Sequence, residues 1–279
     1  MNGKRLNLLI LILLIGLNLA LFAYYCFQKI SVNWVSIERM NQIESLYLEN
    51  GIAIRVNPDR KNTPQPDLVL GEADLDKLVE SFLVDRYDKS YIYGSKVQYT
   101  TGSIVILTDR KNHSISYMDE SKKSEDKASQ NAEEMLEILE AVAGGFARKW
   151  LGDEIYLSDS GMAGDEFYYV YHPVQEGAIL YFNELTIHMT TKGVTSAQLS
   201  YWAVKGKTEK KYEQMPIDEI LYAQLGMIKK DMGENQREEV VQIRNGYQLL
   251  EGEEGASAVP TITIVVKSGR KYVMNRTAV

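Results

Sequence analysis

The chain has 279 residues, 45% of them hydrophobic, so it is long enough to bury one or two apolar cores. It carries 31 basic and 38 acidic residues, and this acidic balance argues against nucleic acid or anionic polymers as its main partner. The only cysteine, Cys26, lies inside an apolar N-terminal run, which excludes a disulfide framework in the remainder.

Residues 6–27 form an apolar run without a formal charge. As a helix, this run would extend about 33 Å, enough to cross a hydrocarbon core about 30 Å thick. Lys4 and Arg5 precede it, and positive charge before a first span favours the cytoplasmic side. The sequence therefore predicts a cytoplasmic tail at 1–5, a transmembrane helix at 6–27 and an extracytoplasmic remainder anchored in the cell membrane. Without the two leading cations, 29 basic residues face 38 acidic ones, a net charge of −9.

Two cleaved forms are alternatives to this retained anchor. A signal peptide needs a shorter apolar core and a small-x-small cleavage site, but Ala20 and Ala23 have the wrong spacing. Cleavage and acylation at Cys26 would need small residues before it, where Tyr24 and Tyr25 stand. Aromatic residues at the end of a span are typical of the interfacial belt of a retained helix.

Asparagine side chains inside the run indicate a possible contact surface. Asn7 and Asn18 are eleven residues apart, about three helical turns, and therefore share a face with Leu11 and Leu14. Such polar side chains hydrogen-bond across helices, each contributing about 0.6 to 2 kcal/mol, and Gly16 would allow close approach. Alternatively, Asn7 simply reaches the membrane interface. We take these five residues as a candidate transmembrane interaction face.

The next segment, residues 28–120, is predicted to form a first extracytoplasmic α+β half. Helical spacing of apolar residues begins at Trp34 and stops at Asn50-Gly51, a common C-terminal pair. A second helix is expected at 74–84, with Asp74 as its N-cap. Strand-forming residues then predict an antiparallel meander over 96–101, 103–109 and 113–119.

Residues 121–130 contain no large apolar side chain and are the predicted hinge before a second half at 131–279. Helices are expected at about 132–151 and 217–230. The strands expected between and after them are 154–159, 166–174, 178–184, 185–191, 194–205, 237–250, 260–268 and 271–275. The predicted fold class is α+β, a two-part body of antiparallel sheets with packed helices.

The chain has three histidines: His113, His172 and His188. If Glu176-Gly177 is a two-residue hairpin turn, His172 lies opposite Tyr181. The same register places His188 opposite Asp165, so these two histidines would not meet to bind a metal. No recognisable hydrolase, metalloprotease or nucleotide-binding motif occurs. We predict no catalytic, cofactor-binding or metal-ligating residue, and no enzyme activity.

The whole layout resembles the YycI/YycH-type regulators of Gram-positive bacteria. The resemblance lies in the basic N-terminus with one span, the LYLENGIAI junction at 46–54, the GYQLLEGEE segment at 246–254 and the closing VPTITIVVKSGRKYVMN at 259–275. The length is closer to that of YycI than to the longer YycH.

The resemblance implies a non-enzymatic accessory of a two-component system that controls cell-wall metabolism. The implied partners are a sensor histidine kinase and a YycH-like single-pass protein, contacted in part through transmembrane helices. A second hypothesis is a membrane-anchored inhibitor or binding protein for an exported protease or cell-wall hydrolase, acting through a sheet edge. An anchored hydrolase is a third, less favoured by the absent motifs.

Overall fold

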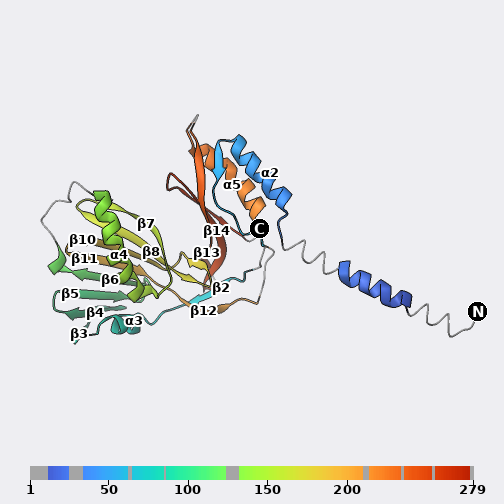
Figure 1. Ribbon diagram of the computed structural model, residues 1–279. Helices are drawn as coiled ribbons and strands as arrows, with labels where there is room; N and C mark the ends of the chain where they lie inside the picture. The colour runs from blue at the N-terminus through green and yellow to red at the C-terminus, as the bar shows by residue number, and fades with distance from the viewer. Residues whose placement is uncertain are drawn as a thin grey trace, which may run out of the picture. The chain divides into compact units, whose positions relative to one another are not determined.

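A computed structural model describes residues 12–24, 34–61, 65–84, 86–123, 132–209, 214–233, 236–252 and 255–276. The described residues form two compact units, each assembled from separate stretches of chain (Figure 1). Unit 1 draws on Met1–Gln65, Tyr212–Ile243 and Ile262–Val279, and unit 2 on Pro66–Lys211 and Arg244–Thr261. Both units combine helices with strands, and the large sheet of unit 2 is mostly antiparallel, so the predicted α+β class is confirmed.

The compact part of unit 1 contains two helices, two whole strands and parts of two others. These are α2 (Ile37–Glu49), β1 (Ile52–Ile54), α5 (Ile217–Asp231), β15 (Lys271–Asn275), the start of β13 (Glu238–Gly252) and the end of β14 (Gly255–Val266). β1 pairs in parallel with β13, and β15 pairs with β14. The helices α2 and α5 lie side by side (Figure 1).

The ends of α2 follow from its sequence. Ser36 caps the start, because its Oγ accepts a hydrogen bond from the backbone N–H of Arg39 at 3.2 Å. At the other end, the Asn50 side chain donates to the carbonyl of Leu46 at 2.8 Å. Between them, the buried Tyr47 hydroxyl donates to the carbonyl of Leu221 in α5 at 2.7 Å. This bond joins the two helices beside the apolar cluster of unit 1, and the ion pair of Arg39 in α2 with the buried Asp218 in α5 joins them as well.

Unit 2 is the larger unit, and its strands and helices follow one another closely along the chain. They are β2 (Leu68–Gly71), α3 (Leu75–Phe82), β3 (Asp88–Tyr91), β4 (Lys96–Thr101), β5 (Ile104–Asp109), β6 (Ser114–Asp119), the 3-10 turn η1 (Glu120–Lys122), α4 (Ala132–Leu151), β7 (Ile155–Ala163), β8 (Glu166–Gln175), β9 (Ala178–Leu180), β10 (Glu184–Thr190), β11 (Gly193–Ser200) and β12 (Ala203–Lys207). The remaining parts of β13 and β14 complete it.

The main sheet of unit 2 has the strand order β3-β4-β5-β6-β11-β10-β8, with β7 also on β8, and every pair is antiparallel. Alternate residues of each strand are buried, as with Val97 and Tyr99 in β4. They pack against α4 through small and apolar residues such as Leu139 and Ala143 (Figure 1). The core of unit 2 therefore lies between this sheet face and its helices.

This grouping differs from the predicted division into residues 28–120 and 131–279. Strand β6, which precedes the predicted hinge, pairs with β11, which follows it, in the register Ile115↔Leu199 and Tyr117↔Ala197. Sheet hydrogen bonds thus join both sides of the hinge into one unit. Most of the hinge itself, residues 124–130, lies outside the described residues.

The hairpin predicted at Glu176-Gly177 is present, and both residues have positive φ, 52° and 77°. Its register, Val174↔Ile179, confirms the predicted pairing near the turn. Farther out the prediction is wrong, because β9 ends at Leu180 and the chain enters β10 in a new register. His188 consequently lies opposite Tyr168, not Asp165.

Gly246 is required where β13 approaches β9. A Cβ added there would lie 2.9 Å from the backbone carbonyl oxygen of Ile179 and 2.5 Å from the ring of Tyr181. Because a backbone atom cannot move aside cheaply, we expect Gly246→Ala to destabilise unit 2 by about 1–3 kcal/mol. Gly206→Ala is the matched control, since no atom lies within 4 Å of its added Cβ. Thermal unfolding followed by circular dichroism measures both; equal melting temperatures would contradict the expectation.

Candidate functional site

The N-terminal segment is helical over residues 12–24, and its side chains are exposed. Within the parts of the chain that the structure describes, no helix is both long and apolar enough to cross a membrane. The predicted span at 6–27 extends beyond this stretch at both ends. It therefore stays a prediction of the sequence.

Three of the five residues of the predicted interaction face lie in this helical stretch, whereas Asn7 and Leu11 lie outside the described residues. The Asn18 side chain donates a hydrogen bond to the carbonyl of Leu14 at 3.0 Å, so the two share one face. Gly16 is two residues from Asn18, about 200° around the helix, and lies on a different face. This bond uses one of the two N–H groups of the Asn18 amide within its own helix.

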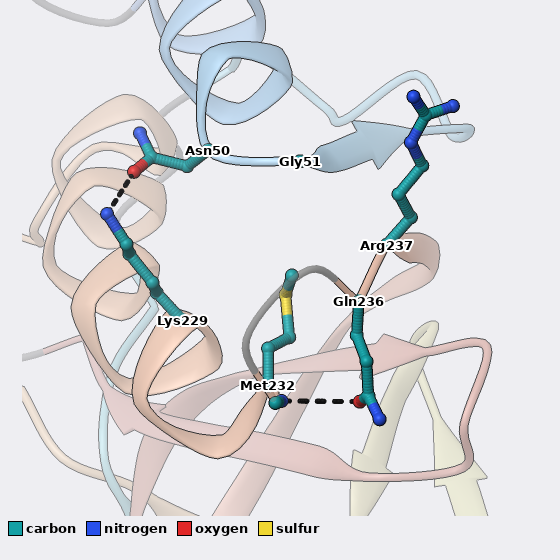
Figure 2. Close-up of a pocket in the computed structure, with 7 residues that line it drawn as sticks. Asn50, Gly51, Lys229, Met232, Gln236 and Arg237 are labelled. Carbon is teal, nitrogen blue, oxygen red and sulfur yellow. Dashed lines mark hydrogen bonds between the residues drawn. The ribbon is translucent and has the colours of Figure 1, made fainter.

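Unit 1 has a hollow where α2 and α5 both end (Figure 2). Its volume is ≈ 470 Å³, and Figure 2 shows Met232 pointing into the space between Asn50 and Gln236. Lys229 Nζ donates to Asn50 Oδ1 at 2.8 Å, and Gln236 Oε1 accepts from the backbone N–H of Gly233 at 3.2 Å. These polar groups stabilise the C-terminal ends of the two helices, where a cation is favoured by the helix dipole.

Unit 2 has a larger hollow of ≈ 590 Å³, which we name the aromatic hollow. Four segments that are distant in sequence meet there: the β5–β6 turn, the β9–β10 connection, the end of β11 and the middle of β13. Its lining residues are Lys111, Asn112, His113, Tyr181, Phe182, Glu184, Ser200, Trp202, Gln248 and Leu249.

Buried polar groups fix the walls of the aromatic hollow. Asn183 is 3% exposed and binds the backbone of Trp202 twice: its Oδ1 accepts from the N–H at 2.6 Å and its Nδ2 donates to the carbonyl at 3.1 Å. The Trp202 ring stacks on His113 with centroids 3.6 Å apart. His113 itself has a φ of 49°, uncommon for a residue other than glycine. The tryptophan is therefore held in place from both backbone and ring.

A buried histidine lies behind the same wall. His172 is 4% exposed, its Nδ1 lies 2.9 Å from the carbonyl oxygen of Asn183, and its Nε2 lies 3.9 Å from Glu184 Oε2. The other histidine–carboxylate pair, His188 with Glu166, also measures 3.9 Å. Among the described residues, no group of three or more histidine, cysteine, aspartate or glutamate side chains is placed to hold a metal ion.

The sequence alone did not point to the aromatic hollow. His172 and Tyr181 were expected to be neighbours, and their rings are 5.2 Å apart. The contributions of Trp202 and Gln248, however, depend on how β11 and β13 pack. The only local signal was Trp202 inside the strand predicted at 194–205, and a tryptophan in a strand occurs equally in ordinary cores.

No protein-family model matches the chain, and neither does any curated protein. Nine chains of solved structures match, among them the following two. An uncharacterized protein from Eubacterium rectale has a TM-score of 0.45 and 13% identity, covering 81% of this chain and 86% of that chain. The YpeB C-terminal domain of Bacillus megaterium has a TM-score of 0.42 and 13% identity, covering 74% and 94%. At this distance the likeness assigns neither a family nor a function.

Proposed function

We propose that this protein is a non-enzymatic, membrane-anchored accessory regulator of a sensor histidine kinase in a two-component signal-transduction system. Its N-terminus would be cytoplasmic and its α+β body extracytoplasmic. The proposal rests on the sequence resemblance to YycI/YycH-type regulators. The resemblance implies that the controlled process is cell-wall metabolism. A YycH-like single-pass protein is the second proposed partner.

The observation that best supports the proposal is the exposed apolar helix at 12–24. Side chains such as Leu13 and Phe22 have no protein to cover them among the described residues, and such surfaces mark contacts with lipid or protein. Asn18 breaks the apolar character of this helix at the middle of the predicted span. A polar group at that depth favours contact with another helix over contact with lipid alone.

The mechanism that fits such an anchor is a shift in the equilibrium between two kinase states. A helix that packs differently against the two states biases the equilibrium by the difference of its two binding free energies. A reversal from 1:99 to 99:1 needs about 5.5 kcal/mol, and a smaller adjustment needs proportionally less. A few interhelical contacts supply energies of this order.

Photo-crosslinking from position 18 in the native host tests the proposal. We expect the photoreactive residue at Asn18 to give protein adducts that mass spectrometry identifies as a sensor kinase or a single-pass partner. Position 13 is the control, because it lies five residues away, about 140° around the helix. Lipid adducts alone from both positions, with the protein present and folded, would contradict helix-mediated regulation.

A second candidate function is favoured by one edge of unit 2. Strand β3 pairs only with β4 among the described strands, so its other edge is unpaired. Three large side chains follow one another there, Tyr91, Ile92 and Tyr93, the last 88% exposed. An unpaired edge with apolar neighbours suits the binding of an extended segment. An anchored binding protein of this kind should tolerate replacement of its whole span, whereas a kinase regulator should not.

A further inference from the structure

The aromatic hollow of unit 2 has the chemistry of a ligand site. Its ≈ 590 Å³ lies within the range of about 300–1,000 Å³ that small-molecule pockets occupy. Apolar contact is offered by Trp202, Leu249 and the buried Phe182. The frame that Asn183 and His113 provide for Trp202 fixes this surface before any ligand arrives, which reduces the entropy cost of binding.

Several polar side chains in the lining are available to a ligand. Lys111, Ser200 and Gln248 make no side-chain hydrogen bond or ion pair with other residues in the described ranges, and all three are exposed. Glu184 is half-exposed and lies 3.9 Å from His172. Together these groups offer an ammonium, a hydroxyl, a primary amide and a carboxylate around one aromatic wall.

This mixture favours a ligand with many neutral hydroxyl groups over a charged one. A zwitterion or a phosphate would depend on Lys111 or Glu184, but both charges are well hydrated, and exposed ion pairs contribute little. A hydroxyl group both donates and accepts, so it can bond to the amide, the carboxylate and the ammonium alike. If the hydroxyl groups stand on a ring, the C–H groups of that ring can cover the apolar wall of the hollow.

We propose that the aromatic hollow of unit 2 is a binding site for a neutral saccharide. Trp202 and Leu249 contact the sugar ring, and Glu184, Ser200 and Gln248 hydrogen-bond its hydroxyl groups. This proposal does not depend on the proposed kinase regulation. If the body is extracytoplasmic, a saccharide bound there could serve as the signal that it senses.

The three tryptophans of the chain allow a direct test. The full chain is labelled with 5-fluorotryptophan, solubilised in a sugar-free detergent and titrated with maltotriose, cellotriose and N-acetylated chitotriose while fluorine NMR is recorded. Trp202→Phe assigns the resonance of the hollow, and Trp34 and Trp150 serve as internal references. We expect at least one trisaccharide to shift the Trp202 resonance saturably and leave the other two unchanged.

Variants of the lining then check the contacts. Gln248→Ala and Glu184→Ala should each weaken that binding about five- to tenfold, the effect of one lost hydrogen bond. Gln175→Ala, an exposed glutamine outside the hollow, is the matched control and should leave the affinity unchanged. Unaltered Trp34 and Trp150 resonances show that each variant is folded. The proposal is overturned if no trisaccharide gives a saturable Trp202 shift, or if only glycylglycine or phosphate does.

Discussion

Replacing Trp150 with alanine should lower the free energy of unfolding of unit 2 by about 3–5 kcal/mol, the range for deleting a large buried aromatic side chain. Trp150 is 4% exposed in α4 and stacks on Phe82 of α3, with ring centroids 4.3 Å apart. Phe146 packs edge-on against the same Phe82 ring. The substitution therefore removes this stacked contact between α3 and α4 and leaves a cavity where the indole ring packed.

Hydrogen exchange in increasing urea, read by mass spectrometry on peptides from α4 and β8, measures this loss within unit 2. Trp150→Phe is the informative control: the indole Nε1 has no hydrogen-bond partner among the described residues, so phenylalanine should cost much less than alanine. Val142→Ala, at an exposed position of the same helix, should have little effect. Similar losses for the alanine and phenylalanine variants would show that packing against Phe82 is not the cause.

A buried carboxylate joins α3 to the sheet of unit 2. Asp76 is 8% exposed; its Oδ2 accepts from Arg110 Nη2 at 2.7 Å, and Lys89 Nζ lies 3.4 Å from the same oxygen. Its Oδ1 accepts from the buried Thr108 hydroxyl at 3.3 Å. Burial by itself would raise the pKa of Asp76, but the hydrogen bond and charge of Arg110 and the charge of Lys89 outweigh it and lower the pKa below its usual value.

This shift fixes the direction of the pH dependence. Because the folded-state pKa is lowered, the unfolded state binds more protons near pH 4, and stability rises with pH there. The stabilisation is complete above the unfolded value of about 3.9 and is lost as the pH falls through the lower folded value. Asp109 and Asp119 act in the same direction. Burial would raise their pKa values, but hydrogen bonds from Ser95 and Asn112 to Asp109, and from Ser121 and Ser103 to Asp119, lower them.

We therefore expect Asp76→Asn to lower the stability of unit 2 at pH 7 by about 1.5–3 kcal/mol, the range for hydrogen bonds to a charged group. The variant should also lose less stability than the unmodified chain between pH 5 and pH 3, a window about the unfolded pKa of aspartate. Urea unfolding at several pH values measures both effects. Asp153→Asn, an exposed carboxylate without an ion pair among the described residues, is the control. A variant as pH-sensitive as the unmodified chain would contradict the role of Asp76.

Local sequence determined the elements of this protein. The helix α2 begins at Ile37, three residues after the predicted start at Trp34, and ends as predicted before Asn50-Gly51. The meander from Lys96 to Asp119 and the turn at Glu176-Gly177 follow from alternating burial and turn chemistry. These signals act over a few residues and need no distant partner. The same local reading predicts the apolar span at 6–27 and the face containing Asn18.

Only the tertiary structure decided how the elements are grouped. Pairing of β6 with β11 joins segments about eighty residues apart, and β13 and β14 each contribute to both units, so no linear division of the sequence could describe them. The aromatic hollow likewise exists because Asn183 fixes Trp202 across a gap of 19 residues while β13 supplies Gln248. The register of a strand pair depends on which sheet face is buried. Burial of a whole face requires the assembled core, so the register is not set by local sequence alone.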